Sequence, residues 1–385
     1  MPLVEERAQS SPGNGDPARR SGVAYAPHRP DEAGSRVSRA VRRARERSAI
    51  NGYRAVAAAV SRVPPSVALP LGRAIFVGSY FAWPRKRRII LENASNVLGL
   101  PPRDRQVRHL ARRIYGTYAR FIIELMRLPS MPDDEPARLM RPGGELGEDS
   151  FIALFERLRA EGRGLIAVSA HIGSIDVMAG AMAIRGLPVY GLADDSAYPE
   201  LFEELNAQRR RWGITVIPWR NLRRVFAALR EPGILGLVVD WGYRPDGIPV
   251  QLFGRWTTLP AGPALLAAKT GAAIVPVVCR RLDDGSYSAR HYDVIEVAGT
   301  SAAELRRATQ AVATAVEDMI ATAPDQWYSF KPIWPETDAE RDDLAQRAET
   351  ALAQESRTAS GGDRSAGTGR SAGRGRSAGR GRSAD

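Results

Sequence analysis

The chain has 385 residues, including 36 Gly and 27 Pro, and its C-terminal end is polar and repetitive, so we expect a folded part of about 300 residues. The hydrophobic fraction of 44% is enough for a full core, and the single cysteine, Cys279, excludes an intramolecular disulfide framework and favours a reducing compartment. No apolar run is long enough and free enough of charge to predict a transmembrane helix or a secretory signal.

The net charge of +12 lies mainly at the two ends of the chain. Residues 1–48 contain 10 Arg against 6 acidic residues, and residues 356–385 contain 7 Arg against 2 Asp, which leaves only +3 for the body. We expect both ends to be disordered: a basic leader over residues 1–48, and a Gly/Ser/Ala/Arg-rich tail over residues 346–385 that has no apolar face to bury. The tail is either a polyanion-binding arm or a solvated extension.

The folded domain is predicted over residues 49–345, and its first part, residues 49–149, is helical. Short apolar helices are expected between Asn51 and Pro84, broken by three prolines, Pro64, Pro65 and Pro70. The last of these helices carries aromatic residues that lead directly into the basic stretch 85–88. The segment from Phe76 to Arg88 therefore suits either a membrane interface or a core helix followed by a basic turn. Apolar residues at three- and four-residue steps predict a helix over 103–127.

From residue 150 to residue 335 the pattern alternates between short apolar runs and helical periods. This rhythm predicts an α/β fold with a mainly parallel, twisted sheet flanked by helices. The expected strands are 164–169, 187–193, 215–218, 234–240, 273–279 and 287–297. The expected helices are 150–159, 177–186, 199–212, 221–230, 261–270 and 301–321.

One of the four histidines occupies a position typical of an active site. His171 follows the strand 164–169 directly, where open α/β sheets place their ligand-binding crevice. His28 lies in the leader and His109 is on the polar side of a helix, so both are expected to be solvated. His291 lies in a charged strand segment and is expected to be a surface residue and not a ligand.

Asp176 follows His171 by five residues, at the predicted start of a helix. Its carboxylate could fold back to one nitrogen of the imidazole and leave the other nitrogen free as a general base. Asp176 could also simply complement the helix N-terminus. No nucleophile elbow, phosphate-binding loop, dinucleotide fingerprint or zinc ligand set accompanies His171, which favours direct acyl transfer to a hydroxyl without a metal.

The segment GRGLIAVSAHIGSIDVMAGAMAIRGLPVYG resembles the first block of the bacterial lipid A lauroyl/myristoyl acyltransferase family, which includes the phosphatidylinositol mannoside acyltransferases. Further similar blocks follow in order: RRRWGITVIP, then ILGLVVDWGYRPDGIPVQLFGRWTTLPAGPALLAAKTGAAIVPVV, then APDQWYSFK. The resemblance covers roughly residues 50–335 and implies a glycerolipid acyltransferase-like fold. The family's H-x-x-x-x-D/E motif falls on His171 and Asp176, which implies that His171 is the base and Asp176 the carboxylate that assists it.

The resemblance also implies substrate-binding residues. Asp240 either shapes the site or binds the acceptor, or it is a structural, salt-bridged residue. One of Arg209, Arg210 and Arg211 could hold a phosphate. Gly254 lies either in a flexible stretch near the cleft or in a plain loop.

The implied enzyme transfers a long acyl chain from acyl-CoA or acyl-carrier protein to a membrane glycolipid, without a metal or other cofactor. It would be peripheral, on the cytoplasmic face of the cell membrane, and attracted to an anionic surface, with no specific nucleic acid partner. Ser174, Ile175 and Asp176 stand where lipid A enzymes typically carry Asn, Trp and Glu, so the phosphatidylinositol mannoside branch is favoured. The alternative is a non-catalytic polyanion- or membrane-binding protein on the same scaffold, but the charge of the body is only +3, which argues against polyanion binding.

Overall fold

The computed structural model describes residues 36–142, 147–193 and 199–366 of the chain. Of the disordered leader expected over residues 1–48, residues 1–35 lie outside the described residues, whereas residues 36–48 are helical, so that part of the prediction is wrong. The part of the expected disordered tail beyond residue 366 also lies outside the described residues. The chain divides into two units, residues 1–45 and residues 46–385, and of the first unit only the start of one helix is described. The second unit holds the sheet, its flanking helices and every site residue predicted from the sequence.

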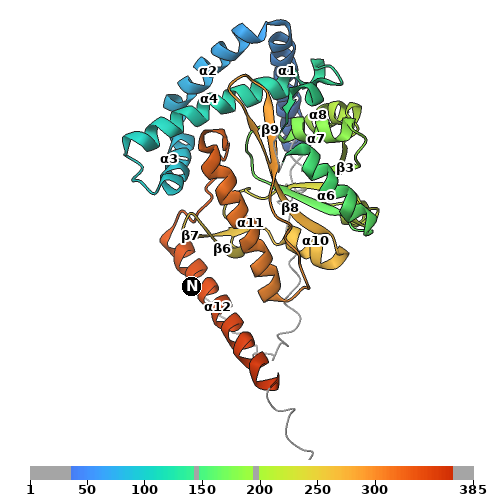
Figure 1. Ribbon diagram of the computed structural model, residues 1–385. Coiled ribbons are helices and arrows are strands. Elements are labelled where there is room, and N and C mark those ends of the chain that lie inside the picture. Colours follow the sequence, from blue (N-terminus) through green and yellow to red (C-terminus); the bar gives the residue numbers. More distant parts are fainter. Residues whose placement is uncertain (1–35, 143–146, 194–198, 367–385) are drawn as a thin grey trace, which may run out of the picture. The chain divides into compact units, whose positions relative to one another are not determined.

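Helices form the part of the chain that precedes the sheet, as expected. They are α1 (Arg36–Arg62), α2 (Pro65–Ala82), α3 (Pro84–Leu98), α4 (Arg105–Arg127), the 3₁₀ turn η2 (Leu128–Ser130) and α5 (Glu135–Leu139). The break at Pro64 and Pro65 is confirmed, but Pro70 lies inside α2, so the expected break at Pro70 is wrong. Pro70 removes only one backbone hydrogen bond, and α2 packs side by side with α4 (Figure 1), which stabilises the uninterrupted helix.

Helix α4 begins at Arg105, two residues later than predicted, because Asp104 caps it. The Asp104 carboxylate accepts a hydrogen bond from the Gln106 backbone N–H at 2.7 Å, and an apolar stripe then faces inward. The buried side chains of α2, α3 and α4 form a small core of their own, namely Tyr80, Ile90, Ala94, Val107, Leu110, Ala111, Ile114 and Tyr115. We call α2, α3 and α4 the helical layer.

The sheet has seven strands in the order β1-β9-β8-β2-β5-β3-β4. All neighbouring strands are parallel except β8 and β9, which confirms the mainly parallel sheet (Figure 1). The strands are β1 (Met140–Arg141), β2 (Leu165–Ser169), β3 (Val189–Ala193), β4 (Thr215–Pro218), β5 (Ile234–Val238), β8 (Ala273–Arg281) and β9 (Tyr287–His291). The helices between and after them are α6 (Glu148–Ala160), α7 (Ile175–Ile184), α8 (Pro199–Arg211), α9 (Leu222–Arg230), α10 (Gly262–Thr270), α11 (Ala302–Thr322), the 3₁₀ turn η4 (Pro324–Gln326) and α12 (Asp338–Ala366).

Alternate residues of the central strands enter two separate cores, one on each face of the sheet. Ile166 and Val168 of β2 pack on the face covered by α9, α10 and α11, with their buried residues Leu229, Ala264 and Val312. Leu165 and Ala167 pack on the other face, against α6 and α7. Because helices cover both faces, the central strands are apolar throughout and only their ends are available for chemistry.

A two-stranded antiparallel hairpin, β6 (Ile248–Leu252) and β7 (Arg255–Leu259), is absent from the sequence-based prediction, which placed a flexible stretch from Gly254 onward. Phe253 and Gly254 form its two-residue turn, with φ values of 51° and 67°. Two consecutive positive φ values are what a tight hairpin turn needs, and only the second residue is a glycine. Phe253 is tolerated there because its backbone N–H is bound by Glu317 of α11 at 2.5 Å.

The chain after residue 345 also differs from the prediction of a disordered tail. Helix α12 continues to Ala366, and Leu344 and Ala348 on one of its faces are buried. The helix packs against β6 and β7, and Arg347 donates a hydrogen bond to the Gly247 carbonyl at 2.6 Å. The hairpin therefore provides the surface that orders the first turns of this helix.

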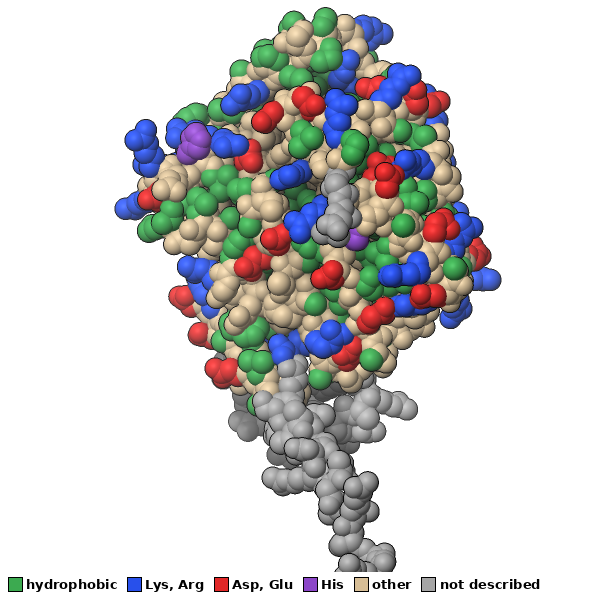
Figure 2. Space-filling view, in the orientation of Figure 1, with side chains coloured by type: hydrophobic (Ala, Val, Ile, Leu, Met, Phe, Trp, Pro, Cys, Tyr) green, Lys and Arg blue, Asp and Glu red, His purple; other side chains and the backbone are tan. Residues whose placement is uncertain are grey.

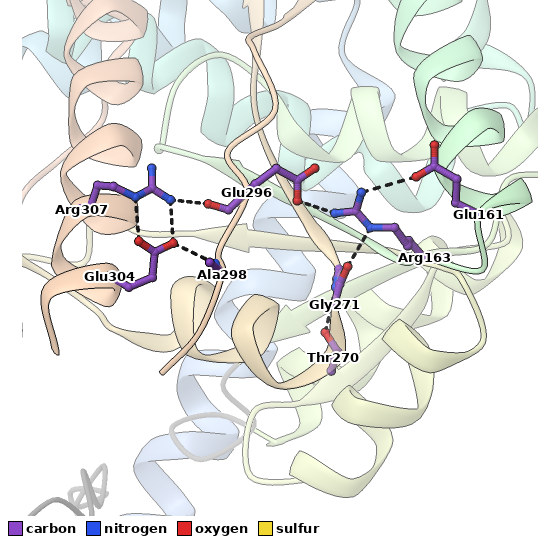
Figure 3. A network of polar contacts seen from close by, with 9 residues as sticks. Glu161, Arg163, Thr270, Gly271, Glu296, Ala298, Glu304 and Arg307 are labelled. Atoms are coloured by element: carbon purple, nitrogen blue, oxygen red, sulfur yellow. Dashed lines mark hydrogen bonds and ion pairs between the residues drawn. The ribbon is translucent and has the colours of Figure 1, made fainter. Parts of the chain in front are cut away.

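A polar network ties together the edge of the sheet where β2 and β8 begin (Figure 3). Arg163, just before β2, donates hydrogen bonds to the Gly271 carbonyl at 2.9 Å and to Glu296 at 2.5 Å. Arg307 of α11 binds Glu304 and the backbone carbonyl of Glu296. These contacts hold the amino ends of the strands, at the edge opposite to the one that carries His171.

A short segment links the helical layer to the sheet. Residues 327–331, which we call the strap, run beside His171, whose carbonyl accepts a hydrogen bond from the Tyr328 N–H at 2.8 Å. Asn93 of α3, which is buried, donates hydrogen bonds to the carbonyls of Ser329 at 3.0 Å and Lys331 at 2.9 Å. Phe330 packs between Tyr115 and Tyr118 of α4. One side chain of the helical layer thus fixes the backbone of the strap.

Replacing Asn93 by alanine should lower the free energy of unfolding by about 2 to 4 kcal/mol, because two backbone carbonyls of the strap lose their donor. Urea unfolding followed by circular dichroism measures this loss. Asn96→Ala on the same helix is the matched control and should change stability by less than about 1 kcal/mol, since no hydrogen bond of its side chain holds the strap. Equal effects of the two substitutions would show that Asn93 does not hold the strap.

Candidate active site

The register of two neighbouring strands brings His171 and Asp240 together. Ser169, the last residue of β2, pairs with Val238, the last residue of β5. His171 and Asp240 each follow two residues later, so parallel pairing places them side by side at the carboxyl edge of the sheet. The chain turns away at Gly173, whose φ is 58° and where an added Cβ would lie 1.8 Å from the Cys279 carbonyl oxygen, so only glycine fits.

Asp240 holds both the ring and the backbone of His171. Its Oδ1 lies 2.7 Å from His171 Nδ1, and its two oxygens accept the His171 backbone N–H at 3.1 and 3.0 Å. The indole N–H of Trp327, in the strap, donates to Oδ2 at 2.8 Å. The Asp240 side chain is 3% exposed, whereas the His171 side chain is 37% exposed. The carboxylate is therefore enclosed and fully bonded, and the imidazole remains accessible.

The electrostatics of the pair favour a base in one tautomer. Burial opposes protonation of His171, but the charge and hydrogen bond of Asp240 outweigh burial and raise the pKa of His171 above its ordinary 6.5, with Lys331 opposing the rise. Burial would raise the pKa of Asp240, yet the contacts with His171 and Trp327 lower it below 3.8. An ionised Asp240 accepts a hydrogen bond from Nδ1–H, so Nε2 of the neutral ring is the nitrogen that can take up a proton.

Asp176 lies elsewhere than the sequence-based prediction placed it. Its two carboxylate oxygens accept hydrogen bonds from Arg209 Nε at 2.7 Å and from an Arg209 terminal nitrogen at 3.2 Å, in a fork-to-fork ion pair. The carboxylate that bonds to the His171 ring is that of Asp240. Asp176, in the first turn of α7, is bound to α8. The carboxylate that the sequence spacing assigned to Asp176 is supplied instead by Asp240, which follows β5 and lies 69 residues from His171 in the chain.

The other predicted site residues are distributed around this centre. Arg210 pairs with Glu203 at 3.3 Å, and Arg211 with Asp133 at 2.6 Å, so that Arg209 is the one of the three that reaches Asp176. Gly254 lies in the turn of the β6–β7 hairpin. Substrate binding by Asp240, by these arginines and by Gly254 remains a prediction.

The expectation that His291 is a surface residue is wrong. His291 is buried, and its Nε2 lies 2.9 Å from Ser150 Oγ while its Nδ1 lies 3.2 Å from the Tyr292 carbonyl oxygen. These contacts join α6 to β9 and place His291 in the packing of the sheet. His109 of α4 is exposed, as expected, and His28 lies outside the described residues.

Three residues of the site were not singled out from the sequence. Trp327 binds Asp240, Lys331 places its ammonium nitrogen 4.2 Å from the centre of the Trp241 ring, and Trp241 lies edge to face with His171 at 5.3 Å between ring centres. The strap belongs to the block APDQWYSFK, but the sequence carries no signal that this block and the residues after β5 meet.

A cavity of about 290 Å³ lies beside Asp176, between the helical layer and the sheet. Much of its lining is apolar, and the charged residues Arg120, Glu124, Arg127, Glu135 and Asp176 also line it. The apolar lining comes from α2, α4, η2 and the residues after it, and the start of α7, including Leu69, Phe121, Leu125, Leu128, Met131 and Val177. A cavity of this kind accepts an elongated apolar group.

Other chemistries have little support in the part of the chain that the structure describes. No group of three or more His, Cys, Asp or Glu side chains in it is arranged to hold a metal ion. Cys279 is buried in β8, and burial raises the pKa of its thiol to about 12, so it is a poor nucleophile near neutral pH.

The fold and the His171–Asp240 pair place an accessible imidazole, held by a buried carboxylate, at the carboxyl edge of a parallel sheet. Residues 42–336 match the family model described as bacterial lipid A biosynthesis acyltransferase. The chain belongs to this family and is an acyltransferase, as the sequence resemblance implied.

Curated relatives point to the branch that the sequence favoured. A phosphatidylinositol mannoside acyltransferase of Mycolicibacterium smegmatis is 30% identical over 251 residues, which cover 63% of this chain and 77% of the relative. A phosphatidylinositol mannoside acyltransferase of Mycobacterium tuberculosis (strain CDC 1551 / Oshkosh) is 26% identical over 264 residues, which cover 66% of this chain and 79% of the relative. The family and the branch are therefore confirmed.

The imidazole of His171 should titrate with a midpoint above 6.5, and Asp240→Asn should lower that midpoint, because burial and Lys331 then act against protonation without the opposing carboxylate. NMR of ¹⁵N-labelled histidine side chains, with the His171 signal assigned through His171→Ala, measures both values. Asp176→Asn is the control and should leave the His171 midpoint in place, since Asp176 is bound to Arg209. A larger effect of Asp176→Asn than of Asp240→Asn would contradict this geometry.

Proposed function

We propose that this enzyme transfers a long fatty acyl chain from a thioester, acyl-CoA or acyl-carrier protein, to a hydroxyl of a membrane glycolipid such as a phosphatidylinositol mannoside. The observation that carries the proposal is the His171–Asp240 pair, in which Asp240 fixes Nδ1 and leaves Nε2 on an accessible ring. The acceptor class is suggested by the names of the relatives, which are 26 to 30% identical.

In the proposed reaction, His171 Nε2 takes the proton of the acceptor hydroxyl as its oxygen attacks the thioester carbonyl carbon. A carbon–oxygen bond forms, the carbonyl electrons move to oxygen, and the tetrahedral intermediate then expels the thiolate. The imidazolium returns its proton to the departing sulfur, so the ring is neutral again at the end of the cycle. Asp240 stays ionised throughout and stabilises the transient positive charge on the ring.

We place the acyl chain in the cavity beside Asp176. Its apolar lining comes from α2, α4, η2 and the start of α7, and its wall at Ser174 and Asp176 follows His171 by only three to five residues. Burying methylene groups there stabilises the bound donor by about 0.8 kcal/mol for each group. The ion pair of Asp176 with Arg209 joins α7 to α8 and keeps this wall in place, which is the assisting role we assign to Asp176.

We propose that the enzyme is peripheral, on the cytoplasmic face of the membrane, and docks through the outer surface of α2. Six of the ten large exposed hydrophobic residues among those the structure describes lie between residues 56 and 83. Within α2, Val67, Leu71 and Ile75 recur at four-residue steps, and Phe81 and Trp83 extend the surface. The described residues contain no helix with the length and apolar character needed to cross a bilayer.

The basic stretch 85–88 follows this surface in the chain, but three of its four side chains make contacts within the protein. Lys86 donates to the Phe330 carbonyl at 2.9 Å, Arg87 lies over the Tyr80 ring, and Arg88 pairs with Glu336 at 3.1 Å. Arg85 is exposed and follows the exposed Trp83 by two residues in the chain, an arrangement suited to an anionic headgroup region.

The alternative, a polyanion-binding protein that does not catalyse, has less support. On the face shown in Figure 2, acidic and basic side chains are interspersed over most of the surface and do not gather by sign. A nucleic-acid-binding body would be expected to carry a continuous basic surface. The His171–Asp240 arrangement also has no role in that alternative.

His171→Ala should reduce acyl transfer by about 10²- to 10⁴-fold, because the transferred proton loses its acceptor. The measurement is transfer from ¹⁴C-labelled palmitoyl-CoA to phosphatidylinositol mannoside in detergent micelles, with folding checked by circular dichroism. A folded His171→Ala enzyme that transfers at the parental rate would rule out the mechanism.

Two further variants distinguish the roles of the Asp240 and Asp176 carboxylates. Asp240→Asn should lose more activity than Asp176→Asn, because only Asp240 bonds to the reacting ring. The double variant His171→Ala with Asp240→Asn should be little worse than His171→Ala alone, since the two residues act as one unit. Additive losses would mean that Asp240 contributes independently of His171.

Replacing Leu71, Ile75 and Phe81 together by serine should weaken binding to vesicles of phosphatidylglycerol and phosphatidylcholine by at least about tenfold. The reason is that each apolar side chain contributes about 1.5 to 3 kcal/mol to the free energy of binding when the membrane buries it fully. Co-sedimentation with the vesicles measures the loss. Leu222→Ser is the matched control, because Leu222 of α9 is similarly exposed but lies outside the helical layer. Equal binding of the triple variant and the parent would exclude α2 as the docking surface.

A further inference from the structure

Trp241 is a large aromatic residue that the fold leaves open to solvent directly beside the base. It follows Asp240 in the chain, and 52% of its surface is exposed. The nearest aromatic ring is that of His171, at 5.3 Å between ring centres and nearly perpendicular to it. Proteins usually bury an indole, and an indole exposed on the rim of a reactive site is typical of a binding contact.

The position of Trp241 is fixed from two sides. The Lys331 ammonium lies 4.2 Å from the centre of the indole ring, a distance at which a cation is attracted to the ring face. The backbone is held as well, because Tyr243 N–H donates to the Pro332 carbonyl at 2.8 Å and Gly242 adopts a φ of 105°. The exposed indole is thus held in place before any substrate binds, which lowers the entropy cost of a contact with it.

We propose that Trp241 is the residue that recognises the sugar of the acceptor, by packing its indole against the ring of the glycolipid headgroup whose hydroxyl is acylated. This inference rests on the proposed function. A sugar ring presents carbon–hydrogen bonds on its faces and hydroxyl groups around its edge, and the face of an indole carries partial negative charge that attracts those carbon–hydrogen bonds. A ring resting on Trp241 therefore has a hydroxyl available to the neighbouring imidazole.

The surroundings of Trp241 favour a sugar over an acyl chain. The indole is half exposed and lies next to the Lys331 ammonium and the His171 imidazole, and it follows the buried Asp240 in the chain. It therefore offers an apolar ring face within a polar, solvent-accessible site. The cavity that suits an acyl chain is instead lined by the helical layer and α7, and Trp241 does not line it. Lys331 can donate hydrogen bonds to the hydroxyl groups of a sugar lying on the indole.

The test compares two reactions of the same enzyme. One is transfer of palmitate from palmitoyl-CoA to phosphatidylinositol mannoside, and the other is hydrolysis of palmitoyl-CoA by water without acceptor. We expect Trp241→Ala to raise the KM for phosphatidylinositol mannoside by about tenfold or more and to lower transfer much more than hydrolysis. Trp241→Phe keeps an aromatic face and should recover most of the loss, and Lys331→Gln should give an intermediate KM.

Two results would overturn the inference. If Trp241→Ala lowers transfer and hydrolysis by the same factor, the indole acts by positioning His171 and not by holding the acceptor. If the acceptor KM of a folded Trp241→Ala enzyme is unchanged, the indole does not bind the sugar. In both cases the proposed function stands, whereas a parent enzyme that hydrolyses palmitoyl-CoA but acylates no glycolipid would refute the proposed function together with this inference.

Discussion

The bond between Asp240 and His171 depends on a carboxylate that has been removed from water almost completely. A buried charge of this kind is stable only when every oxygen is satisfied, and here the His171 ring, the His171 backbone and the Trp327 indole satisfy the two oxygens. Three segments must therefore meet at one carboxylate: the turn after β2, the end of β5 and the strap. Most of the architecture near the site serves to bring these three together.

The two central strands supply the first two segments through their register, and the helical layer holds the third, the strap, in place. Asn93 binds the strap from one side, while Phe330 fits among the aromatic rings of α4. Trp241 and Lys331 lie on the solvent side of the same assembly. A surface that suits a membrane, on α2, and a surface that suits a headgroup, at Trp241, are thus connected through a single packed layer.

The sequence predicted those features that depend on local pattern. Strand β2, helix α7 and His171 at the edge between them follow from an apolar run, a helical period and the position of a single histidine, and the structure bears them out. The partner of His171 could not be predicted in this way, because five residues separate it from Asp176 and 69 separate it from Asp240, and spacing favours the nearer carboxylate. The β6–β7 hairpin was missed because Phe253 occupies a turn position where glycine or asparagine is the usual signal.

The contacts that complete the site span unusually long stretches of chain, and this affects how the protein must be made. Asp240 reaches Trp327 across 87 residues, and Asn93 reaches Lys331 across 238. Contacts between residues so distant in sequence form late, because the intervening loop must close first. During synthesis, His171 and Asp240 leave the ribosome well before the strap that satisfies them. The carboxylate is enclosed only once Trp327 has emerged, so a chain cut short before the strap would expose an incomplete site.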